Sequence, residues 1–347
     1  MAGLLANLHD DRGFDVSRQV ESRAQSPGEA FRDHYAWRMA DLALQFYTVG
    51  GDSLVFTGDA DRLVGTLRRL DILREALRTA DDFIVIEDAT DLDLVVSGEK
   101  RGLALTVEGG LPIGSEDLSI LRTLYRLGLR SVNLLWFKAN PLGDGLSEGR
   151  GAGLTDHGRA VTREMNRLGM IPDVSQASRP TFWDIIEEAT VPVIASHSNA
   201  AGCHPHPRNL TDEEIRAIAA TGGLVGLNTF PSVVGEDVEG PDDLIRHASY
   251  IADLVGPEHV CFGLNIIPDA VDDKSFNRER LPESASHSGP EHAAKRHTPG
   301  VEDVTALPDL VARMTELGFS EGDVEKIAFG NIVRVLRAVL PPRLDDN

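Results

Sequence analysis

The sequence is poor in cysteine, short of positive charge and without a long apolar run. Its two cysteines, Cys203 and Cys261, cannot form a disulfide framework and are typical of a protein in a reducing cytosol. No apolar run reaches the roughly 18 residues of a membrane-spanning helix, which excludes a membrane span. Charged residues at positions 10–12 interrupt the first apolar segment, so the sequence predicts no secretory signal and a cytoplasmic location.

The charge balance argues against polyanionic partners. Lysine and arginine total 34 against 55 aspartates and glutamates, which gives a formal net charge of −21. Such a surface repels phosphate backbones and anionic lipid, so neither nucleic acid nor a membrane surface is an expected partner. Hydrophobic residues make up 41% of the 347 residues, which is enough for a packed core.

Short apolar runs alternate with longer amphipathic segments along the chain. Most of the runs are continuous, which is typical of parallel strands covered on both faces. Eight strands with helices between them predict an α/β fold, a (β/α)8 TIM-type barrel in one domain over residues 1–347. An open parallel sheet stays an alternative. The predicted strands are Gly3–Asn7, Leu44–Val49, Leu103–Val107, Ser131–Trp136, Met170–Ser175, Pro192–Ser196, Leu224–Thr229 and His259–Leu264.

The segments between these runs have helical periodicity. The predicted helices are Asp59–Thr79, Leu118–Leu127, Thr155–Leu168, Thr181–Ala189, Thr211–Ala220, Pro241–Val255, Ala306–Leu317 and Glu321–Val339. Two further segments are predicted as long loops. Pro141–Gly153 has five glycines without the spacing of a phosphate-binding loop. Pro268–Gly300 is a polar insertion, either covering an active site or simply mobile.

Polar side chains stand at or just beyond the ends of these predicted strands. In a barrel the carboxyl ends of the strands meet on the face that carries the active site. Two histidines with two carboxylates there suit zinc, and also manganese or iron. Such residues are also common as hydrogen-bonded structural groups, so both interpretations stay open. The residues are His9 and Asp11, Glu108, Trp136, Asp173 and Gln176, His197, and Asn265.

Several motifs are specific in their order and spacing. They include Val107-Glu108-Gly109-Gly110, the segment Arg163–Met170, Ser196-His197-Ser198 and Phe329-Gly330-Asn331. On these motifs the chain resembles the membrane (renal) dipeptidase family, zinc-dependent (β/α)8 enzymes of the amidohydrolase type. The resemblance implies two zinc ions that share a bridging glutamate.

The resemblance also implies which residues hold the metal. His9 and Asp11 match ligands of the first zinc ion, and Glu108 matches the bridging glutamate. His197 matches one histidine of the second ion, whereas Gln176 stands where the family has the other. An amide is a much poorer zinc ligand than imidazole. The second metal site is therefore expected to be weakened.

At the other functional positions of the family, this sequence has either the family's residue or a different one. Arg208 matches the residue that binds the substrate carboxylate. Trp136 replaces a histidine that stabilises the oxyanion, and Asn265 replaces an aspartate that acts as acid and base. Asn7 stands where the first-strand motif begins with aspartate. Since an amide cannot carry a proton near neutral pH, Glu108 is the expected remaining base among these catalytic positions.

These features predict a metal-dependent hydrolase of a dipeptide or a small amino-acid-derived amide with a free carboxylate. One or two divalent ions are expected, with zinc first and manganese or iron as alternatives. The substitutions leave two alternatives open: non-hydrolytic chemistry at a single metal ion, and a non-catalytic barrel scaffold. The expected partner is a small carboxylate-bearing molecule. A homodimer is a further alternative, since family members often dimerise.

Overall fold

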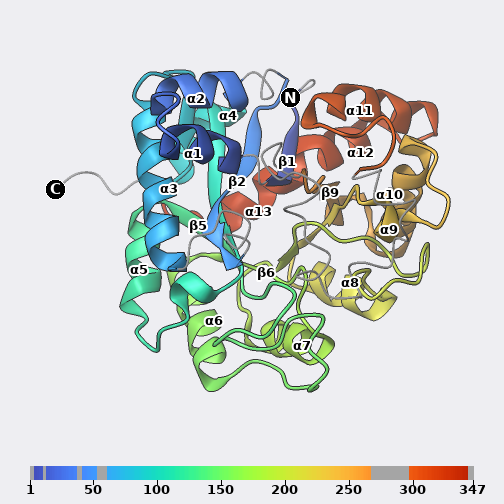
Figure 1. Ribbon diagram of the computed structural model, residues 1–347. Coiled ribbons are helices and arrows are strands. Elements are labelled where there is room, and N and C mark those ends of the chain that lie inside the picture. The colour runs from blue at the N-terminus through green and yellow to red at the C-terminus, as the bar shows by residue number, and fades with distance from the viewer. Residues whose placement is uncertain (1–3, 11–12, 37–40, 53–60, 267–296, 343–347) are drawn as a thin grey trace.

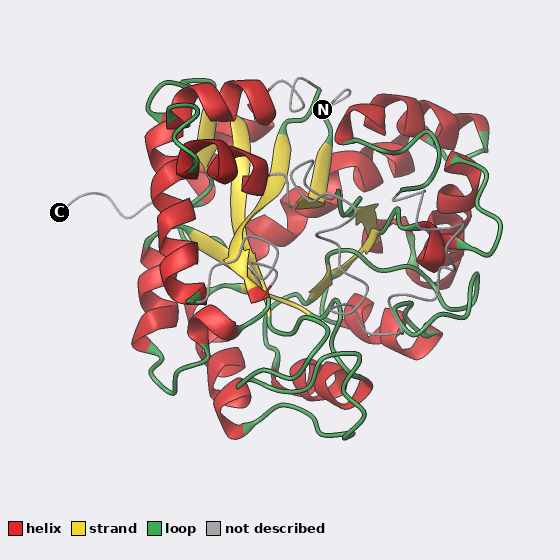
Figure 2. Cartoon of the chain, viewed as in Figure 1, coloured by secondary structure: helices red, strands yellow, loops and turns green. Residues whose placement is uncertain are grey.

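The computed structural model describes the chain except for residues 1–3, 11–12, 37–40, 53–60, 267–296 and 343–347. Parallel strands form a sheet that curls into a nearly closed barrel, and helices surround it (Figures 1 and 2). The predicted (β/α)8 TIM-type fold is therefore confirmed. Most of the predicted insertion at 268–300 lies outside the described residues.

Eight strands follow one another around the barrel, and a ninth lies beside them. Strand β3 (Phe83–Val85) pairs with the start of β4, and β5 pairs with the remainder of β4 on from Leu105. A parallel bridge between Asp10 and Ile266 brings β1 to the segment after β9, so the barrel is nearly closed. The path strands are β1 (Ala6–Asp10), β2 (Leu44–Gly51), β4 (Arg101–Glu108), β5 (Leu129–Asn133), β6 (Ile171–Asp173), β7 (Ile194–Ala195), β8 (Leu224–Leu227) and β9 (Val260–Phe262).

Two predicted strands have an end that is wrong by three residues, and one strand was not predicted. The first strand runs from Ala6 to Asp10 rather than over Gly3–Asn7, since its polar residues are buried in the barrel wall. The fourth ends at Asn133 rather than Trp136, because the Asn133 side chain accepts the Leu135 N–H and turns the chain. Strand β3 was missed, since its short apolar run lies next to a helix.

The helices lie outside the barrel. Helix α6 begins after the capping side chain of Thr155 and ends at Leu168, just before Gly169, as predicted. The predicted helix Glu321–Val339 is interrupted by a π-helical turn at Lys326–Gly330. The helices are α1 (Gly13–Glu21), α2 (Pro27–His34), α3 (Arg62–Leu77), α4 (Ala89–Val96), α5 (Ser119–Arg126), α6 (Asp156–Leu168), α7 (Arg179–Glu188), α8 (Asp212–Ala220), α9 (Pro231–Val234), α10 (Pro241–Val255), α11 (Leu307–Glu316), α12 (Glu321–Glu325) and α13 (Asn331–Val339).

The two ends of the barrel differ in chemistry. An apolar cluster joins the first residues of several strands, such as Leu44, Ile194 and Leu224, to Ile332 and Leu336 of α13. This helix covers the amino-terminal end of the strands (Figure 1). Polar groups are therefore left to the opposite end, where chemistry in this fold is located.

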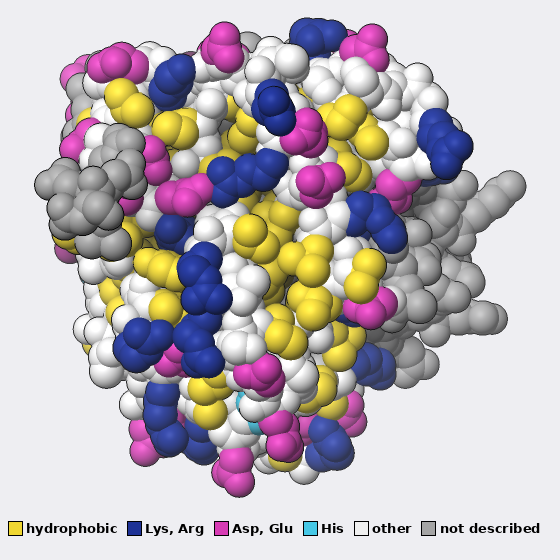
Figure 3. Space-filling model, turned by 90° about the vertical axis from the view of Figure 1, so that its left-hand side faces the viewer, with side chains coloured by type: hydrophobic (Ala, Val, Ile, Leu, Met, Phe, Trp, Pro, Cys, Tyr) yellow, Lys and Arg dark blue, Asp and Glu magenta, His cyan; other side chains and the backbone are white. Residues whose placement is uncertain are grey.

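The outer surface carries charges of both signs. Figure 3 shows acidic and basic side chains interspersed around a band of hydrophobic ones on one face. Elsewhere in the described chain, exposed Arg163 forms an ion pair with Glu188. Within the described part of the chain, every helix is too short or too polar to cross a membrane.

Candidate metal centre

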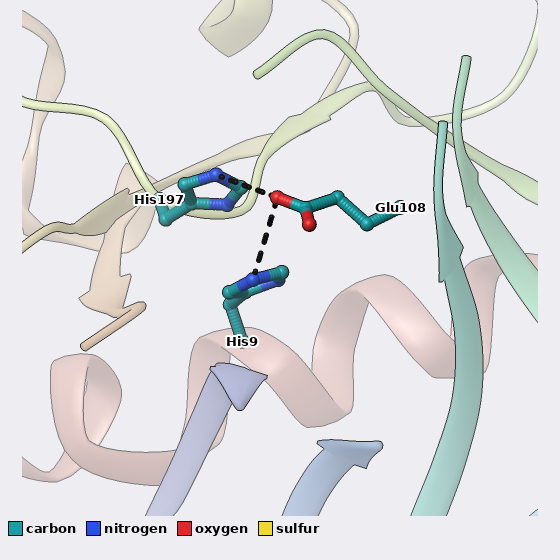
Figure 4. A group of neighbouring side chains, drawn as sticks. All are labelled: His9, Glu108 and His197. Carbon is teal, nitrogen blue, oxygen red and sulfur yellow. Dashed lines mark ion pairs between the residues drawn. The ribbon is translucent and has the colours of Figure 1, made fainter. Parts of the chain in front are cut away.

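Three buried side chains converge at the carboxyl end of the barrel. His9 lies in β1, Glu108 is the last residue of β4, and His197 follows β7 closely. The Nε2 atoms of His9 and His197 lie 3.7 and 3.6 Å from the same oxygen, Oε1 of Glu108 (Figure 4). The exposed fraction is 2% for His9, 4% for Glu108 and 0% for His197. The three side chains thus point at one small, buried volume.

The tautomer of His197 is set by groups behind its ring. Asp173 accepts hydrogen bonds from the Ser196 hydroxyl and from the Ser196 backbone N–H. The hydroxyl has only one hydrogen, so its oxygen accepts from His197 Nδ1–H, 2.7 Å away. Nε2 of His197 is left as a lone-pair donor facing Glu108.

Electrostatics keep this imidazole neutral. Burial lowers the pKa of His197 well below its ordinary value, and the nearby His9 and Arg208 lower it further. The rings of His9 and His197 stack with centroids 4.0 Å apart. A neutral imidazole is the form that binds metal.

The arrangement fits a divalent cation. One ligand atom from each of the three residues lies within 4.8 Å of the other two. Nε2 of His197 is buried and has no hydrogen-bond partner among the residues that the structure describes. Buried nitrogen with no such partner is costly unless a ligand satisfies it, and imidazole with carboxylate is a donor set that zinc accepts.

Gln176 contacts the cluster through its amide nitrogen. The residue follows β6 with a backbone φ of 67° and is buried. Its Nε2 donates to Glu108 Oε1 over 3.1 Å. The structure thus brings the predicted residue to the centre, with hydrogens facing the carboxylate.

Arg208 lies beside the cluster. Its guanidinium donates to the carbonyl of His197 at 3.1 Å and to Ser198 Oγ at 3.4 Å. Burial lowers its pKa to about 10, while Glu108 and Asp173 oppose the fall, so it stays charged at neutral pH. A pocket with about 260 Å³ of empty space, open mouth included, is lined by Gln176, Ser198 and Arg208 and by apolar Val174, Ala177 and Phe182.

The other predicted residues differ in their position. Asp11 lies outside the described residues. Asn265 is buried behind His9, and its backbone N–H donates to the His9 carbonyl at 3.3 Å. Trp136 is half-buried beyond β5, and its ring packs edge-on against Phe137.

The sequence motifs contain Ser196 and Asn7 without predicting that these residues, with Asn133, orient the groups of the centre. Ser196 sits behind His197, Asn133 sits behind Gln176, and Asn7 holds β1 against the end of the barrel. The sequence places Asp173 at a strand end without indicating that it anchors Ser196. Asn133 lies inside the apolar run Ser131–Trp136, so no signal in the sequence marks it as a residue of the centre.

The fold and the cluster together define a parallel α/β barrel with a buried His–Glu–His group at the carboxyl end of its strands. The model of the membrane dipeptidase family (Peptidase family M19) matches residues 37–275. The chain belongs to this family.

Individual relatives agree. The dipeptidase tcpJ of Claviceps purpurea is 29% identical over 279 residues, which is 79% of this chain but only 60% of that protein. A protein of Klebsiella pneumoniae encoded in the pqqA 5′ region, described as uncharacterized, is 29% identical over 72% of this chain and 87% of its own length. A metallopeptidase from Rhodobacter sphaeroides, solved with a phosphinate mimic of a dipeptide, superposes with a TM-score of 0.77 at 23% identity, covering 97% of this chain and 99% of that one.

Proposed function

We propose that this protein is a metal-dependent hydrolase of dipeptides or small amino-acid-derived amides with a free carboxylate. The observation that carries the proposal is the convergence of His9, Glu108 and His197 on one buried volume beside the charged Arg208. Membership of the dipeptidase family supports the same reaction class over the non-catalytic alternative.

The metal ligands in this proposal are His9, Glu108 and His197, with Asp11 as a further ligand. Zinc is the proposed ion, because two imidazoles with carboxylate are a typical zinc donor set. When bound, such an ion polarises an amide carbonyl and makes water more acidic. Glu108 is the group of this chain that takes up the proton of the attacking water.

Arg208 and its pocket are the proposed substrate site. A guanidinium binds a carboxylate through two parallel hydrogen bonds, and the burial of Arg208 strengthens that attraction. The apolar wall of Val174, Ala177 and Phe182 would then accept a side chain of the same substrate. The substrate carboxylate and the scissile amide would be held on adjacent sides of Gln176.

Asn265 and Trp136 are proposed as the positions that limit the rate. An amide at 265 cannot carry a proton, and losing a general acid or base costs about 10²–10⁴-fold in rate. The indole N–H of Trp136 is the remaining donor for an oxyanion at its position. We further propose a single domain and a cytoplasmic location, which the two free cysteines favour.

Steady-state assays of the metal-loaded protein test the proposal. Zinc-, manganese- and iron-loaded samples are offered dipeptides and the same dipeptides with an amidated carboxyl terminus. Hydrolysis of the free-carboxylate series, lost with Arg208→Gln and kept with the exposed Arg216→Gln, supports it. If no metal-loaded sample cleaves any amide, the proposal fails, and non-hydrolytic metal chemistry or a non-catalytic scaffold replaces it.

A further inference from the structure

The place expected for a second metal ion is filled by the Gln176 amide. One oxygen, Glu108 Oε1, is approached by His9, by His197 and by the Gln176 side chain. The first two present imidazole nitrogens, whereas Gln176 presents N–H groups. A cation needs lone pairs, so the Gln176 amide offers no ligand to a second ion on its own side of this oxygen.

The direction of the Gln176 amide follows from its neighbours. The Leu135 N–H donates to Oδ1 of Asn133 at 3.1 Å, so the other end of that side chain is its NH₂ group. That NH₂ group donates to the Ser175 carbonyl at 3.0 Å and to Gln176 Oε1 at 3.4 Å. Gln176 Oε1, its only good metal ligand atom, therefore faces Asn133 and away from Glu108.

The backbone of Gln176 is held as well. Its carbonyl accepts the Leu146 N–H at 2.7 Å, and Gly145 forms an antiparallel bridge with Ala177. These contacts tie the residue, in its left-handed conformation, to the loop over residues 141–153. Turning the amide oxygen toward Glu108 would separate it from Asn133 and lose the hydrogen bond to the carboxylate.

We propose that this centre holds one divalent ion per chain, at His9, Glu108 and His197, and that the Gln176 N–H group takes the place of a second ion by holding Glu108. The inference rests on the proposed function only in requiring a metal at this centre. It makes Gln176 a positioning residue rather than a ligand.

Counting bound metal tests the inference without reference to activity. Wild-type protein equilibrated with excess zinc and gel-filtered is expected to retain about one ion per chain by mass spectrometry. Gln176→His adds an imidazole, which tolerates the positive φ, and is expected to raise the count to about two ions. Gln176→Asn keeps an amide that is too short to reach Glu108, and its count is expected to stay at about one.

Each outcome decides a different claim. The inference is overturned if the wild type binds about two ions per chain. It is also overturned if Gln176→His still binds about one ion while its circular dichroism matches that of the wild type. One ion per chain without any amide hydrolysis overturns the proposed function and leaves the inference standing. A wild type that retains no ion from zinc, manganese or iron overturns both.

Discussion

At the scale of single residues, the centre depends on groups that never touch its proposed ion. Asp173 and Ser196 fix which nitrogen of His197 carries hydrogen, and Asn133 fixes which end of Gln176 faces Glu108. A ligand whose lone pair is already aimed loses less freedom when it binds. Side chains behind the centre therefore contribute to its metal affinity.

Ser196→Ala tests this chain of contacts. The variant removes the acceptor for His197 Nδ1–H, so the ring loses its fixed tautomer. Metal affinity is expected to fall about 10–100-fold, as for other losses behind a ligating histidine. Competition with a chelator measures the affinity, and ¹⁵N shifts of the His197 ring in the metal-free protein report the tautomer. Unchanged shifts, with Ser97→Ala as an exposed control, would show that Ser196 does not set the tautomer.

Asn7 is a second residue whose role is positional. Its Oδ1 accepts the Leu264 N–H at 2.8 Å, and its Nδ2 donates to the His9 carbonyl at 2.9 Å. Asn7→Ala removes the partner of the buried Leu264 N–H and leaves the His9 carbonyl with the Asn265 N–H alone. The free energy of unfolding, measured in urea, is expected to fall by about 1–3 kcal/mol. A change of only a few tenths of a kcal/mol would mean that this side chain does not hold the barrel closed.

At the scale of elements, loops after different strands are joined by buried polar groups. His247 of α10 accepts the Ala200 N–H through Nδ1 and donates from Nε2 to the Val234 carbonyl of α9. The bond at Nδ1 requires the neutral ring, because a proton on Nδ1 would face the Ala200 N–H. Burial accordingly lowers the pKa of His247 to about 4.

This histidine predicts a dependence of stability on pH. The unfolded chain takes up the proton at the ordinary pKa of 6.5, whereas the folded chain resists it until about pH 4. The stabilisation is therefore complete above pH 6.5 and is lost as the pH falls toward 4. The loss amounts to about 3 kcal/mol, measured by urea unfolding at both ends of that range. His247→Gln can make both bonds without titrating, so the difference between wild type and variant should change with pH; a constant difference would contradict the assignment.

The sequence predicts elements well where apolar periodicity decides them. The prediction of element boundaries fails where a single polar contact sets the boundary. At Asn133, for example, the side chain turns the backbone and ends β5 before Trp136. Asn7 has a fully buried side chain inside β1, and no pattern shows that its partner is Leu264, far along the chain. The convergence of His9, Glu108 and His197 can be predicted because strand ends meet in a barrel, whereas the direction of the Gln176 amide depends on contacts from two other loops.

At the scale of the whole molecule, the centre connects distant parts of the barrel. His9, Glu108 and His197 come from β1, β4 and the segment after β7. An ion that binds only the folded chain stabilises it by about 2.7 kcal/mol when its free concentration is 100 times the dissociation constant. Thermal unfolding with zinc and with a chelator is expected to show this gain, and Glu108→Gln should remove most of it. Equal midpoints with and without zinc in the wild type would contradict a metal site in the folded barrel.

The most direct measurement compares dipeptide hydrolysis by zinc-loaded wild type and Glu108→Gln, with the exposed Glu75→Gln as control. Glu108 faces the imidazoles of His9 and His197 and is the proposed proton acceptor. Glu108→Gln should therefore lower kcat/KM by at least about 10²-fold. Glu75→Gln should leave kcat/KM unchanged. A Glu108→Gln protein that hydrolyses dipeptides as fast as the wild type would contradict the assignment of this centre as the site of reaction.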